Sequence, residues 1–193
     1  MAQTIEKSLP RMTVAEFMDW DAIGMIGKLE LVDGVVRAMS PASGTHAIIQ
    51  ANIAYLIGAH LRQHRPGCRV GTEAPIKPSI HANDNVRAPD LAVTCVPSKP
   101  NSKLFPDPIL IVEVLSPSNQ HETWETIRAL ASLSTMQEIL VVDSTRVHVE
   151  ILRRDPGGDW PNIGTVIASG TFELTSIGGT LAVADVYAGS ALA

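Results

Sequence analysis

Apolar and polar positions change their spacing several times along the chain, and each spacing predicts a different element. Between residues 45 and 64 the apolar residues recur every three or four positions, which predicts an amphipathic helix of about five turns. Two shorter runs, 29–32 and 35–39, flank the pair Asp33-Gly34, the strongest short signal for a β-hairpin. We therefore expect a hairpin that leads into a long helix.

Local signals predict two further helices. Thr13, with Glu16 three residues later, forms the capping-box pattern that begins a short helix. Residues 122–133 place Ile127 and Leu130 on one face of a second helix. Both segments are candidates to cover a sheet.

Apolar runs of strand length fill most of the remaining chain. They lie at residues 68–70, 74–76, 91–93, 109–115, 139–143 and 147–152, with weaker ones at 165–168 and 171–174. No internal repeat or linker divides them. The order of elements predicts an α/β fold with a mixed central β-sheet flanked by helices, in one domain over residues 1–193.

Composition and charge argue against some classes of function. The chain has 193 residues, 45% of them hydrophobic and 18% charged, which is typical of a globular domain with a full core. No apolar stretch approaches the roughly 20 residues of a membrane span, and no signal peptide is evident, so we expect no membrane partner. The net charge of −5 argues against coating nucleic acid by bulk electrostatics. A nuclease stays possible, because clustered carboxylates lower the net charge and a bound divalent ion reverses the local field.

The two cysteines, Cys68 and Cys95, are too few for a disulfide scaffold or a thiolate metal site. Both lie in apolar, strand-like contexts, and we expect them to be buried free thiols. A reducing cytoplasm is then the natural compartment.

Two acidic residues at strand ends are the main chemical signal. Asp90 opens one apolar run and Glu113 lies late in the next one. A carboxylate in such a run is costly if unpaired, and two carboxylates from neighbouring strands can share a hard cation such as Mg²⁺. In the alternative reading, Asp90 caps a turn after Pro89, and Glu113 pairs with an arginine such as Arg87.

Several stretches in this order resemble the Uma-type family of proteins described as restriction endonucleases, a branch of the PD-(D/E)XK nuclease superfamily. The similarity extends over residues 13–187 and is carried by the segments 29–34, 39–41 with His46, 86–93 and 111–118. It implies a restriction-endonuclease-like core at about residues 13–187, with metal-binding carboxylates at strand ends.

The resemblance also implies roles for individual residues. Asp90 and Glu113 would be the ligands of Mg²⁺ or Mn²⁺, with the backbone carbonyl of Leu115 as a third oxygen. Glu30 would reach the same metal directly or through water, although it could instead lie on the solvent face of its hairpin. His46 would orient a phosphate or a water, or else bond to a carbonyl at the start of its helix. Glu73 is a weaker candidate.

One feature of the superfamily is missing. Its usual lysine, two residues after the second acid, is replaced by Leu115, and the position from which the Uma-type family often supplies a lysine corresponds to Thr126. Possible replacements are His121, Arg128 and Lys77. Losing one charge stabiliser can cost on the order of 10²–10³ in rate.

These observations support two hypotheses of different kinds. The first is a cytoplasmic, Mg²⁺-dependent DNA endonuclease that uses Asp90, Glu113, Glu30 and His46. The second is a catalytically degenerate nuclease fold that binds nucleic acid, metal or a protein partner. A homodimer is a further possibility, since nucleases of this fold often act in pairs to cut both strands.

Overall fold

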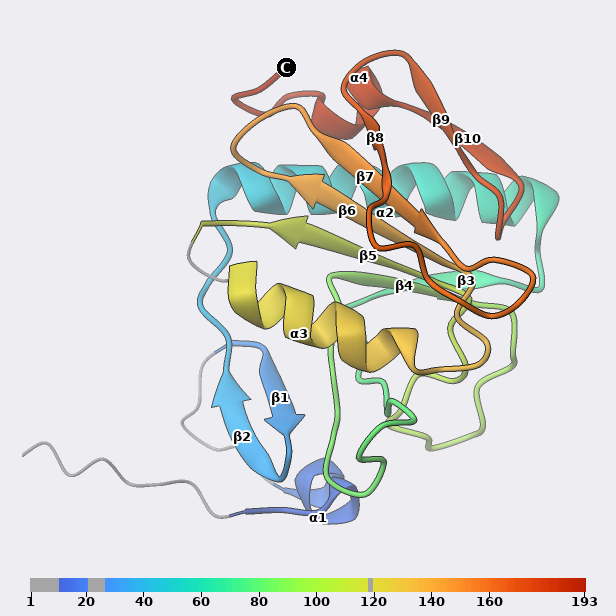
Figure 1. Cartoon of the computed structure of the whole chain (residues 1–193). Helices are drawn as coiled ribbons and strands as arrows, with labels where there is room; N and C mark the ends of the chain where they lie inside the picture. The colour runs from blue at the N-terminus through green and yellow to red at the C-terminus, as the bar shows by residue number, and fades with distance from the viewer. Residues whose placement is uncertain (1–10, 21–26, 118–119) are drawn as a thin grey trace, which may run out of the picture.

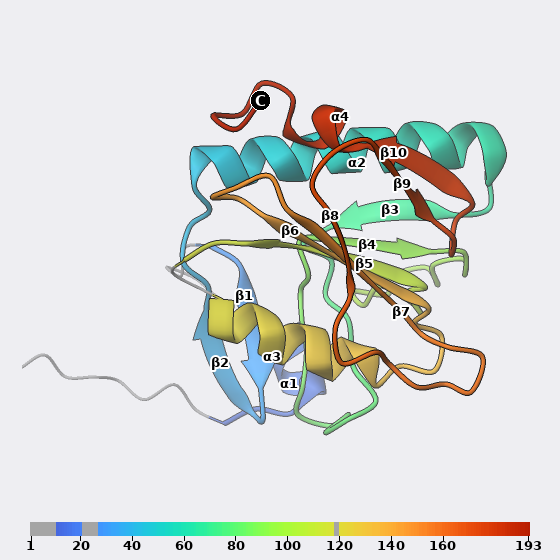
Figure 2. The same ribbon diagram turned by 45° about the horizontal axis from the view of Figure 1, so that its top comes forward.

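A six-stranded mixed sheet forms the centre of the molecule, with helices on both of its faces (Figure 1; Figure 2). The structure is a computed structural model that describes residues 11–20, 27–117 and 120–193. The elements are α1 (Val14–Asp19), β1 (Leu29–Val32), β2 (Val35–Ala38), α2 (Gly44–His64), β3 (Arg69–Thr72), β4 (Leu91–Thr94), β5 (Leu110–Leu115), α3 (Gln120–Ala131), β6 (Glu138–Asp143), β7 (Val149–Arg153), β8 (Thr165–Ile167), β9 (Thr171–Leu174), β10 (Gly179–Ala182) and α4 (Val183–Tyr187).

The sheet has the strand order β3-β4-β5-β6-β7-β8. Only β5 and β6 run parallel, and every other neighbouring pair is antiparallel. A parallel connection needs a crossover, and α3 provides it between β5 and β6. The predicted fold class, a mixed sheet flanked by helices, is confirmed.

The helix α2 covers one face of the sheet. Its buried residues Ile49, Ile53 and Ile57 pack in one cluster with strand residues such as Leu91 and Val112. The hairpin of β9 and β10 and the short helix α4 extend the same cluster (Figure 2). These side chains recur every four residues on α2, so one helical face is removed from water.

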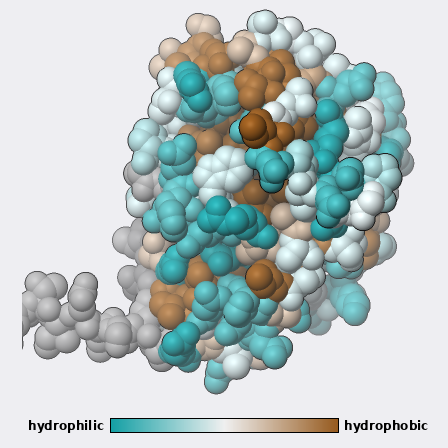
Figure 3. All heavy atoms as spheres, viewed as in Figure 1, coloured by the Kyte–Doolittle hydropathy of each residue, from teal (hydrophilic) through white to brown (hydrophobic). Residues whose placement is uncertain are grey.

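The helix α3 lies on the opposite face of the sheet. Ile127 and Leu130 pack with Ile111 and Ile139 from the strands β5 and β6. The outer side of α3 is hydrophilic, as Figure 3 shows, in keeping with its amphipathic sequence. The hairpin β1–β2 lies next to α3 (Figure 1), and a backbone bridge from Leu31 to Val86 joins it to the segment before β4.

Most predicted elements are confirmed, but one predicted strand does not form, and the structure contains two elements that the sequence did not predict. The hairpin, the long helix and the Thr13–Glu16 capping box form as expected. Residues 74–76 form no strand, because only Ile76 pairs, through a single bridge to Arg87. The strand β10 and the helix α4 carry no strong periodic signal and were not predicted. None of the helices in the described part of the chain has both the length and the apolar character of a membrane span.

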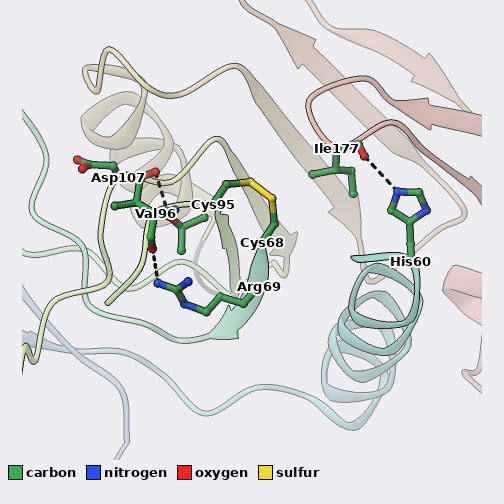
Figure 4. The surroundings of a disulfide bond; sticks show 8 residues. His60, Cys68, Arg69, Cys95, Val96, Asp107 and Ile177 are labelled. Atoms are coloured by element: carbon green, nitrogen blue, oxygen red, sulfur yellow. Dashed lines mark hydrogen bonds between the residues drawn. A yellow bond between two sulfur atoms is a disulfide. The ribbon is translucent and has the colours of Figure 1, made fainter. Parts of the chain in front are cut away.

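The expectation of free thiols is wrong, because Cys68 and Cys95 form a disulfide (Figure 4). Arg69 pairs with Thr94 across β3 and β4, so the adjoining cysteines stand opposite each other. Nothing in the local sequence marks this pairing, since the two residues are 27 positions apart. The Arg69 guanidinium also donates to the carbonyl of Val96 in this region.

We predict that removing this disulfide destabilises the fold. The Cys68→Ser/Cys95→Ser double variant should lose about 2–4 kcal/mol of unfolding free energy, because the unfolded chain is freed from a cross-link. Urea unfolding of the oxidised wild type and of the variant measures the difference. Added dithiothreitol should lower the stability of the wild type and leave the variant unchanged; equal stability of all samples would contradict the prediction.

Candidate functional site

The pairing of β4 with β5 brings Asp90 and Glu113 together. Leu91 lies opposite Val112 in this antiparallel ladder, so Asp90 and Glu113 follow as the next pair. The backbone N–H of Val114 donates to Asp90 Oδ2 at 2.8 Å. The Asp90 side chain is therefore tied by a hydrogen bond to the strand that carries Glu113.

Both carboxyl groups lie on the α3 side of the sheet. Side chains two positions apart share a face of a strand. Ile111 and Leu115 pack against α3, so Glu113 between them faces the same side, and Ala92 indicates the same for Asp90. The two acids therefore share one face of the sheet.

Asp90 is buried and has cationic or polar partners on both carboxyl oxygens. Lys28 Nζ lies 3.3 Å from Oδ1, and His46 Nε2 lies 3.1 Å from Oδ2. Burial opposes ionisation, yet the hydrogen bond from His46 and the charge of Lys28 outweigh it and hold the pKa of Asp90 below its ordinary value. Asp90 is therefore a carboxylate.

Glu113 is in the opposite electrostatic situation. It is 3% exposed, and within the described ranges no lysine or arginine forms an ion pair with it. Burial, followed by the negative charge of Asp90, raises the pKa of Glu113 well above its ordinary value, although Lys28 acts against this. Two adjacent acids thus differ strongly in their affinity for a proton.

Glu138 shows what a structural buried carboxylate looks like in this fold. Arg153 Nε donates to its Oε1 at 2.8 Å, and both the N–H and the hydroxyl of Ser176 donate to Oε2. Thr175 adds two further donors. Glu138 is fully satisfied by the protein, whereas Glu113 is held beside another acid.

Glu30 is a third buried acid at this site. From β1 it accepts hydrogen bonds from the N–H of Ala88 at 2.9 Å and from the Thr126 hydroxyl at 3.2 Å, and Arg87 Nη1 lies 3.4 Å away. The solvent-facing position considered for Glu30 is therefore wrong. Arg87 pairs with Glu30, so its suggested pairing with Glu113 is also not seen.

His46 approaches from the start of α2. Ser43 caps this helix and accepts from the N–H of His46 at 3.2 Å, which directs the first turn at the sheet edge. The imidazole is buried and meets Asp90 through Nε2, while Nδ1 has no partner among the described residues. No backbone carbonyl of the described residues contacts the ring, so the alternative proposed for His46 is not seen there.

The backbone carbonyl of Leu115 is not directed at Asp90 and Glu113. It accepts from the N–H and the hydroxyl of Ser144, at 3.0 and 2.7 Å, and so it points towards β6. The amide and the carbonyl of one residue project to the same side of a strand. Because the Val114 amide meets Asp90, the Val114 carbonyl is the one on that side.

None of the three suggested replacements for the lysine reaches the acids. His121 is exposed and lies 3.9 Å from Glu125, while Arg128 and Lys77 are exposed and line other hollows of the surface.

Lys28 is the residue that sequence reasoning missed. It precedes Glu30 by two positions, and this period-two spacing is the signal that could have found it, because such residues share a strand face. Burial alone would lower the pKa of Lys28, but Glu113, Asp90 and Glu30 together raise it. Lys28 is therefore a charged ammonium.

A cavity of about 320 Å³ opens onto the site. It is lined by Lys28, His46, Glu73 and Asp90, together with the neighbouring residues Gly27, Met39, Ser40, Pro41 and Ala42. Glu73, the weaker candidate, borders this opening, and its N–H donates to the carbonyl of Asp90 at 3.2 Å. Glu30 and Glu113 are buried and are not among the residues that line this cavity.

The side chains do not by themselves form a complete metal cage. Across residues 11–20, 27–117 and 120–193, no group of three or more His, Cys, Asp or Glu side chains is arranged to hold an ion. Mg²⁺ keeps several waters and is commonly held by one or two carboxylates plus substrate phosphates. Asp90 and Glu113 supply the two carboxylates that such a Mg²⁺ site needs.

Comparison with known proteins places the chain among nuclease-like folds. It resembles the crystal structure of "a putative nuclease belonging to DUF820" from Anabaena variabilis, with a TM-score of 0.74 and 19% identity over 91% of this chain and 97% of that one. That likeness concerns the fold. An uncharacterised protein of Synechocystis, slr1290, is 31% identical over 99% of both chains.

A family model described as "Putative restriction endonuclease" matches residues 14–182. This match covers most of the chain, including every acid of the site. The protein belongs to the Uma2 family of nuclease-like proteins.

Proposed function

We propose that the protein is a divalent-metal-dependent endonuclease that hydrolyses phosphodiester bonds of DNA. The observation that carries this proposal is the juxtaposition of Asp90 with Glu113, a buried acid that has no lysine or arginine as ion-pair partner within the described ranges. Family membership and the fold support the nuclease class.

Asp90 and Glu113 would hold Mg²⁺ or Mn²⁺. The Val114 carbonyl takes the place expected for that of Leu115, and Glu30 would act through water, because its oxygens already accept from Ala88 and Thr126. When bound, the ion supplies positive charge for the phosphate and lowers the pKa of a water.

The protein's own residues around the acids act in this reaction by holding the carboxylates in position. Hydrolysis needs attack of a water oxygen on phosphorus, cleavage of the P–O bond and protonation of the leaving oxygen. His46 holds the Asp90 carboxylate through Nε2, so it acts as a positioning residue. Arg87 and Thr126 hold Glu30 in the same way.

One observation favours a second candidate function. Leu115 is packed in the core beneath α3, and Thr126 donates its hydroxyl to Glu30, so neither position supplies a cation. A module that binds nucleic acid, metal or a protein partner without cutting is therefore the alternative, and cleavage assays separate the two.

A DNA substrate favours a cytoplasmic location, although the argument from free thiols no longer holds, since the cysteines are paired. Because one such site cuts one strand, a homodimer would be needed for paired cuts. Size-exclusion chromatography with and without a DNA duplex tests for that dimer.

We predict that wild-type protein nicks supercoiled plasmid in Mg²⁺ or Mn²⁺ and that Asp90→Asn and Glu113→Gln reduce the rate about 10²-fold or more. Agarose gels resolve the nicked and linear products. Glu173→Gln, which changes an exposed acid on β9, serves as the matched control and should cut as the wild type does. Cleavage that survives both site substitutions would reject this site.

Metal binding should also be visible without any substrate. We expect saturating Mn²⁺ to raise the unfolding free energy of the wild type, by about 2.7 kcal/mol at a hundred times Kd. Glu113→Gln should show little of this gain because it removes a ligand. Thermal unfolding in EDTA and in Mn²⁺ measures the effect, and an equal gain in both proteins would speak against Glu113 as a ligand.

Stability should depend on pH through Glu113. Because its pKa is raised in the folded state, its favourable contribution is complete below the ordinary value of 4.5 and is lost as the pH rises through the raised pKa. Metal-free Glu113→Gln should therefore be more stable than the wild type at pH 8, with a smaller difference at pH 5. Urea unfolding in EDTA at both pH values tests this; a difference independent of pH would refute it.

A further inference from the structure

The geometry points to Lys28 as the residue that contacts the reacting phosphate and supplies the positive charge missing from the superfamily's usual lysine position. This inference rests on the proposed function and names the cation that the function requires. Lys28 lies directly before β1, on a different element from both Leu115 and Thr126.

The two positions at which related nucleases carry the lysine are Leu115 and Thr126, and neither can supply a cation here. Leu115 packs with Ile127 and the rest of the cluster under α3, and as an apolar side chain it supplies no charge. Thr126 is also buried, and its hydroxyl donates to Glu30. A cation for this site therefore has to come from another element.

Lys28 reaches the acids from the hairpin side. Its Nζ lies 3.3 Å from Asp90 Oδ1, and its side chain is 16% exposed. Its positive charge also acts on Glu113 and Glu30. The ammonium group of Lys28 thus interacts electrostatically with all three buried acids of the site.

The surroundings of Lys28 leave it able to bind a phosphate. An ammonium group has three N–H donors, and Asp90 is the only side-chain partner of Lys28 within the described ranges. Lys28 lines the open cavity beside His46 and Asp90, so a phosphate that enters would meet it. Lysine binds phosphate as a compact point charge.

Arg87 is the other cation close to the acids, but its position differs. It is 5% exposed, pairs with Glu30 and lines a separate hollow together with Arg37 and Arg128. Of the described lysines and arginines, Lys28 is the one that borders the cavity over Asp90.

A purely structural role for Lys28 makes a different prediction. If Lys28 served only as a counter-ion that neutralises Asp90, Lys28→Met would leave the affinity for DNA unchanged. If Lys28 contacts phosphate, the loss of its charge weakens binding to any DNA sequence and lowers its dependence on salt.

The experiment compares Lys28→Met, Lys28→Arg and the control Lys77→Met, which alters an exposed lysine at another hollow. Fluorescence anisotropy with a labelled DNA duplex in Ca²⁺, over a range of KCl concentrations, reports binding without requiring cleavage. Lys28→Met should bind about 5- to 10-fold more weakly, with a salt slope smaller by about one. Lys28→Arg should recover most of the affinity, and Lys77→Met should match the wild type.

Plasmid nicking in Mg²⁺ provides the second readout, where Lys28→Met should be slower by about 10²–10³-fold. If the wild type nicks but Lys28→Met binds and nicks equally well, the inference fails and the proposed function stands. If the wild type binds without nicking and only Lys28→Met loses affinity, hydrolysis fails and the phosphate contact stands. A wild type that neither binds nor cuts overturns both.

Thermal unfolding checks that each variant is folded. If Lys28→Met does not fold, Lys28→Gln replaces it, because its amide retains a donor for Asp90 while the charge is removed. The same losses are expected for Lys28→Gln, and wild-type affinity in that variant would overturn the inference.

Discussion

The antiparallel pairing of β4 with β5 is the constraint on which the site depends. It places Asp90 opposite Glu113, and the Val114 backbone N–H holds the Asp90 carboxylate against the strand of Glu113. Two buried carboxyl groups this close repel each other when both are ionised, and this repulsion destabilises the folded state. A single-residue slip in the register would turn one acid to the other face and separate the pair.

The rest of the site can be understood as a response to that repulsion. His46 and Lys28 stabilise the charge on Asp90, Arg87 and Thr126 hold Glu30, and Glu113 retains its proton more strongly. Glu138 shows that the same fold can satisfy a buried acid completely with donors from Arg153 and Ser176. The incomplete satisfaction of Glu113 is therefore a local property of this site, and it is what a cation would relieve.

The sequence was sufficient to predict that Asp90 and Glu113 are buried on neighbouring strands, because each lies in an apolar run where a carboxylate is unusual. It also predicted the hairpin and the long helix, since both depend on local spacing and turn chemistry. Leu115 was assigned to the metal site from its position in the motif, but the direction of its carbonyl depends on pairing with β6. The disulfide was missed for a similar reason, because Cys68 and Cys95 meet only when β3 pairs with β4.

By itself, the sequence determined the fold class, the family resemblance and the short list of acids, since these are written in periodicity and in residue type. Only the tertiary structure decided that Arg87 pairs with Glu30, that His46 meets Asp90, and that Lys28 borders the cavity. Arg87 and Glu30 lie 57 positions apart in the chain, His46 and Asp90 lie 44 apart, and Lys28 and its partner Asp90 lie 62 apart. No local pattern encodes contacts of that range, because they arise only when separate strands and helices pack together.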